Sequence, residues 1–231
     1  MLLERRDKGR ENKMKKSAYS IVLSDEVVEA IDAMAYSMNT SRSNLINQIL
    51  AEKVSLLTPE RRMKDIFGRI EQLMDKHFQL LDQPSDAMMS VKSPLKFKYK
   101  PTIKYSVELF RNFEGCVGRL KISFRTQSSR LINAINQFFE FWQKLENKYL
   151  SDLFKNGVPW DINYVNFTRE FYSPRNPALS DDEIANAIGA YINLIDQCIK
   201  IFFENLDDSD AQAQNIEKTY REYLKKGLLI L

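Results

Sequence analysis

The side chains best suited to chemistry in this sequence are basic, and they gather between residues 96 and 130. This stretch carries nine Lys or Arg residues and only two acidic residues, Glu108 and Glu114. Two runs in it alternate with a period of two, which predicts a hairpin of two strands. Alternation places these basic residues on one face of that hairpin: Lys96, Lys98, Lys100, Lys104, Arg119, Lys121 and Arg125. Such a face could follow a phosphate backbone with salt-dependent, sequence-independent attraction, or it could be the solvated outer face of a sheet.

A second basic segment lies at the start of the chain. Residues 1–16 contain seven Lys or Arg residues against three acidic residues, and they lack the apolar core of a signal peptide. A segment of this composition cannot pack alone. It is therefore either a mobile arm that is attracted to phosphates or a solubilising tail, and translation from Met14 would remove most of it.

Residues that could perform catalysis are scarce. His77 is the only histidine, and it lies on an apolar helical stripe, where a packed or hydrogen-bonded core histidine is expected. The sequence has no glycine-rich phosphate loop, nucleophile elbow or His-Cys cluster. Cys116 and Cys198 are too far apart to indicate a metal motif or a disulfide framework. The sequence therefore predicts a protein that is not an enzyme and that uses no cofactor or metal.

The most specific pattern of elements follows the first basic segment. Residues 17–24 alternate along the chain, which predicts a short strand. Ser24 then begins a helix as an N-cap followed by two acidic residues, and Asn39 tolerates the left-handed conformation that ends a helix. Thr40 or Ser41 caps a second helix. Because a lone strand needs a partner for its backbone groups, we expect it to pair with the same strand of a second copy.

This order of strand, helix, turn and helix resembles the ribbon-helix-helix family of the Arc, MetJ and CopG type. The resemblance covers residues 15–54 and is carried by the strand SIVLSDEV, the helix run VVEAIDAMA and the turn NTSRSNLI. It implies a homodimer whose paired strands enter the major groove of DNA, with each second helix presenting its N-terminus to the backbone. The groove-facing residues would be Lys16, Ala18, Ser20 and Val22. The residues at the phosphates, where free amides favour an anion, would be Ser41, Arg42, Ser43 and Asn44.

The sequence departs from the family pattern on the groove-facing side. Bases are normally read by Arg, Lys, Asn, Gln or hydroxyl groups, and only Lys16 and Ser20 belong to these types. Ala18 and Val22 could contact thymine methyl groups, so the ribbon would read DNA weakly. The resemblance implies a dimeric transcriptional regulator, such as a repressor. The alternative is an accessory protein of a plasmid, partition or mobilisation assembly that uses this segment mainly to dimerise.

The whole chain predicts an α+β fold that is predominantly helical, in which a β-hairpin plus helices follows the ribbon-helix-helix unit. Helical spacing of apolar residues in the C-terminal half predicts helices near 127–150, 180–205 and 209–226. A composition of 44% hydrophobic and 28% charged residues, with no long apolar run, predicts a cytoplasmic protein with no membrane partner. We expect DNA, a second copy or higher oligomer, and a protein partner of the last domain. The predicted segments are a basic arm at 1–16, the ribbon-helix-helix unit at 17–57, a connecting helix at 58–82, a linker at 83–94 and the last domain at 95–231.

Overall fold

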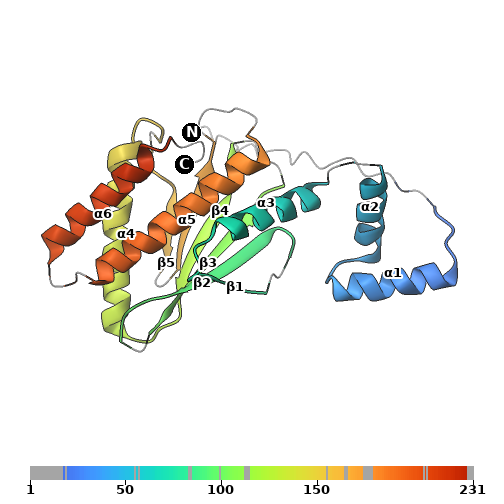
Figure 1. Cartoon of the computed structure of the whole chain (residues 1–231), viewed down its shortest axis with the longest axis horizontal. Coiled ribbons are helices and arrows are strands. Elements are labelled where there is room, and N and C mark those ends of the chain that lie inside the picture. Colours follow the sequence, from blue (N-terminus) through green and yellow to red (C-terminus); the bar gives the residue numbers. More distant parts are fainter. Residues whose placement is uncertain are drawn as a thin grey trace, which may run out of the picture. The chain divides into compact units, whose positions relative to one another are not determined.

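The computed structural model of the chain divides it into two compact units, with the boundary between residues 55 and 56 (Figure 1). The structure describes residues 18, 20–54, 56, 58–82, 85–98, 100–111, 115–154, 156–163, 166–173, 179–204, 206 and 208–227.

The described part of the N-terminal unit is a pair of helices. Helix α1 spans Asp25–Ser37 and helix α2 spans Arg42–Lys53. Asn39 between them has a φ of 50°, the left-handed conformation that was predicted for it. The backbone N–H of Thr40 donates to the carbonyl of Ala35 at 2.9 Å, which closes the turn. Both predicted helices and the turn that joins them are confirmed.

The predicted ribbon strand is not observed. Ala18 and residues 20–24 belong to no strand, and Ser24 is extended only as the N-cap of α1. Ser17 and Tyr19 lie outside the described residues. The prediction of a strand here is therefore wrong. The physical reason is that strand geometry persists where backbone N–H and C=O groups are paired, and no described segment pairs with this one.

The C-terminal unit is built on a six-stranded antiparallel sheet in the order β1-β2-β3-β4-β6-β5. The sheet overturns the predicted fold class, because a β-hairpin plus helices was expected for this half of the chain, with no more than one further weak strand near residues 161–174. The strands are β1 (Gln79–Leu80), β2 (Met88–Pro94), β3 (Thr102–Leu109), β4 (Cys116–Phe124), β5 (Trp160–Asn163) and β6 (Asn166–Tyr172). The segment 83–94 was predicted as a linker because of its prolines and serines, yet its second half is β2, which pairs with β3 along seven residues.

Four helices among the described residues complete the C-terminal unit, and α5 runs across the strands in Figure 1 with α3 beside it. They are α3 (Pro59–Leu73), α4 (Ser129–Leu150), α5 (Asp181–Glu204) and α6 (Ser209–Leu224). The three predicted C-terminal helices are thus confirmed. Helix α3 is shorter than the predicted connecting helix, and its residues Met63, Ile66 and Ile70 are buried in the core of this unit. No described helix has the length and apolar character needed to cross a bilayer.

The two faces of the sheet differ sharply. On the inner face, alternate residues such as Tyr105, Leu120 and Phe167 are fully buried in one core with apolar residues of the helices. On the outer face, the intervening residues of the central strands are exposed or half-buried, with the exception of the buried Ser90. This alternation is typical of an antiparallel sheet with one face packed on the core and one face open to solvent.

Candidate nucleic-acid interface

The start of α2 is built by local hydrogen bonds. Ser41 is the N-cap, and its Oγ accepts from the backbone N–H of Asn44 at 3.3 Å. The side chain of Asn44 donates to Thr40 Oγ1 at 3.2 Å. Two of the four predicted phosphate ligands therefore use their side chains to shape the helix end. The exposed Ser43 precedes the first intrahelical hydrogen bonds, so its backbone amide has no acceptor within the helix at its positive end.

Arg42 forms an ion pair with a residue of α1. Its guanidinium donates to both carboxylate oxygens of Asp32 on α1, with Nε 2.5 Å from Oδ1. The hydrogen bond from Arg42 lowers the pKa of the Asp32 carboxyl, and the same bond raises the pKa of Arg42. The ion pair joins the two helices and neutralises the cation that was expected to bind phosphate.

The segment that precedes α1 presents its side chains to solvent. Ala18, Ser20 and Val22 are exposed, and Val22 has 98% of its surface accessible. Lys16 lies outside the described residues. Three of the four predicted groove-facing residues are therefore accessible for contact, although they are not held on a strand.

The helix pair leaves much of its apolar surface uncovered. Among its described residues only Ala35 and Leu45 are buried. Met34 is 49% exposed on α1 and Leu50 is 52% exposed on α2, and several further apolar residues are similarly accessible. Apolar side chains that stay accessible in this way can pack against another chain.

The predicted basic face of the C-terminal unit is divided between a loop and the sheet. Lys96, Lys98 and Lys100 lie in the loop between β2 and β3, where Lys100 has a φ of 44° and the strand is interrupted before Pro101. Lys96 forms an ion pair with Glu204 at 3.3 Å. The prediction that these three lysines share a strand face is wrong, because alternation in the sequence continues through residues that form a turn.

The remaining predicted basic residues do lie on or near the outer face of the sheet. Lys104 is on β3, Arg119 and Lys121 are on β4, and the exposed Arg125 follows the end of β4. Arg119 pairs with Glu108 on β3 at 2.7 Å. The sequence reasoning missed Lys92, which lies on β2 directly opposite Lys104. Extending the alternation of Met89, Val91 and Ser93 upstream of Pro94 would have placed Lys92 on this face.

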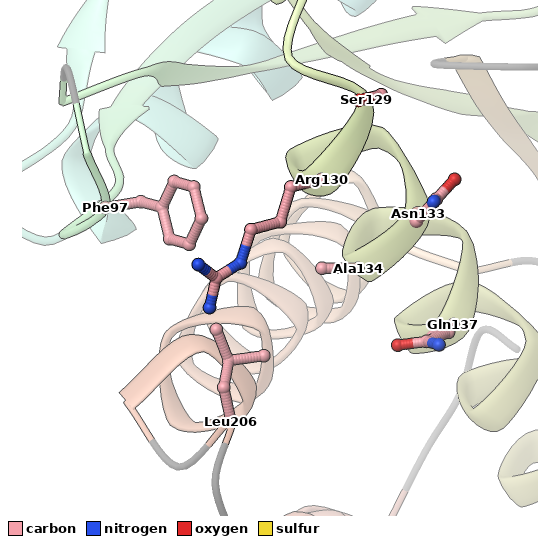
Figure 2. Close-up of a pocket in the computed structure, with 7 residues that line it drawn as sticks. All are labelled: Phe97, Ser129, Arg130, Asn133, Ala134, Gln137 and Leu206. Atoms are coloured by element: carbon pink, nitrogen blue, oxygen red, sulfur yellow. The ribbon is translucent and has the colours of Figure 1, made fainter.

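A hollow of about 460 Å³ lies beside the first turns of α4, at the end of the sheet where the β2–β3 loop begins (Figure 2). The Arg130 guanidinium reaches between Phe97 and Leu206. The residues that line the hollow are Phe97, Ser129, Arg130, Asn133, Ala134, Gln137 and Leu206. One cation and two amide side chains make this hollow polar, and they add donors at the basic end of the unit.

The ionisable groups of the core are engaged with one another. Asp196 accepts hydrogen bonds from Tyr105 Oη at 2.9 Å and Lys200 Nζ at 2.6 Å, and its Oδ2 lies 2.8 Å from His77 Nε2. Burial, followed by the charge of Asp196, raises the pKa of the Tyr105 hydroxyl. His77 is thus a hydrogen-bonded histidine at the edge of the core, but it lies in the turn after α3 and not on the predicted helical stripe. The described residues contain no group of three His, Cys, Asp or Glu side chains that could hold a metal ion.

Comparisons of this chain with protein-family models, with curated proteins and with solved structures gave no match.

Proposed function

We propose that this chain is a dimeric DNA-binding protein that regulates transcription, with the N-terminal helix pair serving as both the dimerisation unit and the DNA contact. The observation that carries the proposal is the combination of a capped, outward-facing start of α2 with an apolar surface that the helix pair does not bury. A second copy would cover the apolar surface of Met34 and Leu50. The same assembly would present two positive helix ends to one duplex.

In this proposal the start of α2 binds phosphate through backbone amides and Ser43. The exposed segment before α1 supplies the contacts to bases. Lys16 and Ser20 would donate hydrogen bonds, and Ala18 and Val22 would contact thymine methyl groups. With few donors for base edges, most of the affinity comes from the backbone and falls with salt.

The test places a negative charge at the start of α2. Ser43→Glu adds a carboxylate where the helix dipole tolerates it, so the fold is retained, but the carboxylate repels phosphate. We expect at least a tenfold loss of affinity for duplex DNA in an electrophoretic shift at physiological salt. The matched control is Asn47→Glu, which adds the same charge one turn further along α2 at another exposed position. Equal affinity of the two variants and the parent would refute this DNA contact.

One observation favours a second function. Arg42 is the cation nearest to the proposed phosphate site, and Asp32 neutralises its charge in an ion pair. A helix pair specialised for dimerisation would use this ion pair simply to fix α1 against α2. In that case the protein is an accessory factor whose C-terminal unit binds a protein partner. A chain that forms a dimer but binds no duplex DNA would support this alternative.

A further inference from the structure

Three lysines form a cluster on the outer face of the sheet, and we name it the lysine face: Lys92 on β2, Lys104 on β3 and Lys121 on β4. Lys92 lies directly opposite Lys104 in the strand register. Lys121 lies opposite Ser106, two residues along β3 from Lys104. None of the three forms an ion pair with another described residue.

This arrangement is unfavourable for the protein alone. Side chains that are directly opposite on antiparallel strands lie about 5 Å apart at Cβ, and like charges in such pairs are destabilising. An acidic residue across the ladder from a lysine would stabilise the pair instead. Here Lys104 instead has Lys92 on one side and Ser123 on the other.

The acidic residues of the same face are elsewhere. Glu108 and Glu170 flank Arg119 on the two neighbouring strands, at the opposite end of the ladder from Lys104. Asp161 is separated from Lys121 by Thr168 on the strand between them. Charge is therefore segregated along the sheet, and the exposed Arg125 extends the positive end beyond β4.

The neighbours of the three lysines are small and polar. Ser106, Ser123, Asn166 and Thr168 occupy the adjoining outer positions of β3, β4 and β6. These side chains can donate hydrogen bonds to phosphate oxygens. The aromatic residue Tyr172 lies at the far end of this face and bonds Glu170 at 2.5 Å. Single-stranded nucleic acids are held by stacking of bases on aromatic side chains, and the lysine face offers none among its described neighbours.

We propose that the lysine face binds the sugar-phosphate backbone of duplex DNA without reading its sequence. The positive charge, the hydroxyl and amide donors and the lack of stacking side chains together fit a phosphate backbone and not exposed bases. The choice of DNA as the nucleic acid rests on the proposed function. The contact itself involves only residues of the C-terminal unit, so it adds a second contact to the DNA backbone beside the one proposed for the helix pair.

The test uses the full chain with Lys92→Gln, Lys104→Gln and Lys121→Gln combined, and measures affinity for a duplex of arbitrary sequence over a series of salt concentrations. Loss of three phosphate contacts should lower the slope of log affinity against log salt by about 2.7, because each contact contributes about 0.9. The matched control combines Lys64→Gln, Lys144→Gln and Lys218→Gln, exposed lysines on α3, α4 and α6. The control has the same net charge and should keep the parent slope.

A second readout excludes a fold defect. Removing the repulsion between Lys92 and Lys104 should leave the triple variant at least as resistant to urea as the parent, while its DNA affinity falls. Equal slopes for the triple variant and the control would overturn the proposal. So would a loss of binding to anionic lipid vesicles with unchanged binding to DNA.

The outcome also separates this proposal from the function proposed for the helix pair. If the lysine variant weakens binding and Ser43→Glu does not, the lysine face stands and the helix-pair contact fails. If only Ser43→Glu weakens binding, the helix-pair contact stands and the lysine face fails. A parent chain that binds no duplex at any salt concentration overturns both.

Discussion

At the scale of single residues, the least expected feature is an ion pair buried in the core of the C-terminal unit. Arg169 on β6 and Glu146 on α4 are 1% and 0% exposed at their side chains, with Nε 3.2 Å from Oε2. Glu146 also accepts hydrogen bonds from Trp160 Nε1 at 2.5 Å and from Tyr191 Oη at 3.0 Å. Burial alone would lower the pKa of Arg169, but the charge of Glu146 raises it. The carboxylate is therefore fully satisfied although it is remote from water.

This pair predicts a non-additive effect of substitution. Glu146→Gln should destabilise the unit by about 3–5 kcal/mol, because it leaves the Arg169 cation buried without a counter-charge. Adding Arg169→Met should recover much of that loss, since the site is then neutral. Urea unfolding of the parent, both single variants and the double variant measures the coupling. Single effects that simply sum in the double variant would show that the two side chains do not stabilise one another.

At the scale of elements, helices were more predictable than strands. The capping box at the start of α5 can be recognised from four consecutive residues. In it the Glu183 carboxylate accepts a hydrogen bond from the backbone N–H of Ser180 at 2.8 Å. The strand β2 carries no such local signal, because Ser93 is fully buried and Pro94 ends it. Its partners β1 and β3 create the environment that makes it a strand. Lys92 was missed as a site residue because the prolines and serines of 83–94 led to the prediction of a linker there.

The turn between α1 and α2 and the outer face of the sheet show why the candidate sites were only partly predictable. Asn39 was identified correctly and the cap was narrowed to Thr40 or Ser41, because caps and left-handed turns depend on residues within one turn of chain. The pairing of Arg42 with Asp32 depends on how α1 meets α2. The partners of Lys104 depend on the strand register. Contacts between elements have no signature in the local sequence.

Two glycines test how tightly the elements are packed. At Gly118 on β4, an added Cβ would clash with the carbonyl of Glu108 on β3 and lie 3.1 Å from the Cα of Leu109. Gly118→Ala should therefore destabilise the unit by about 1–3 kcal/mol through a forced shift of the strands. Gly68→Ala is the matched control, because Gly68 is exposed within α3 and its added Cβ meets no described atom within 4 Å. It should stabilise the unit by about 0.5–1 kcal/mol.

Thermal unfolding followed by circular dichroism measures both variants. A Gly118→Ala variant as stable as the parent would mean that β3 and β4 are further apart at this point than the structure shows.

At the scale of the whole molecule, the two units differ in how their cores are completed. The C-terminal unit encloses one large core between the helices and the inner face of the sheet. The helix pair buries two residues among those described and relies, in our proposal, on a second copy. Stability that depends on association varies with protein concentration, whereas stability within one chain does not. The two units should therefore unfold in separate transitions with different concentration dependence.

The chain carries natural probes for this prediction. Both tryptophans, Trp142 and Trp160, lie in the C-terminal unit, so their fluorescence reports on that unit alone. Helical circular dichroism reports on both units. We expect the tryptophan midpoint in urea to be independent of protein concentration. A second transition should be visible by dichroism only. Its free energy of unfolding should fall by about 1.4 kcal/mol for each tenfold dilution if the helix pair is dimeric.

A pair of substitutions on α1 assigns the second transition to the apolar surface of the helix pair. Met34→Glu places a charge on the side of α1 that carries Ile31, three residues earlier, and it should abolish the concentration-dependent transition. Ala33→Glu places the same charge on the exposed side, a rotation of about 100° away, and should leave that transition intact. If the two variants behave alike, or if fluorescence and dichroism coincide at every concentration, the helix pair does not assemble through this surface. The dimeric function proposed for it would then lose its structural basis.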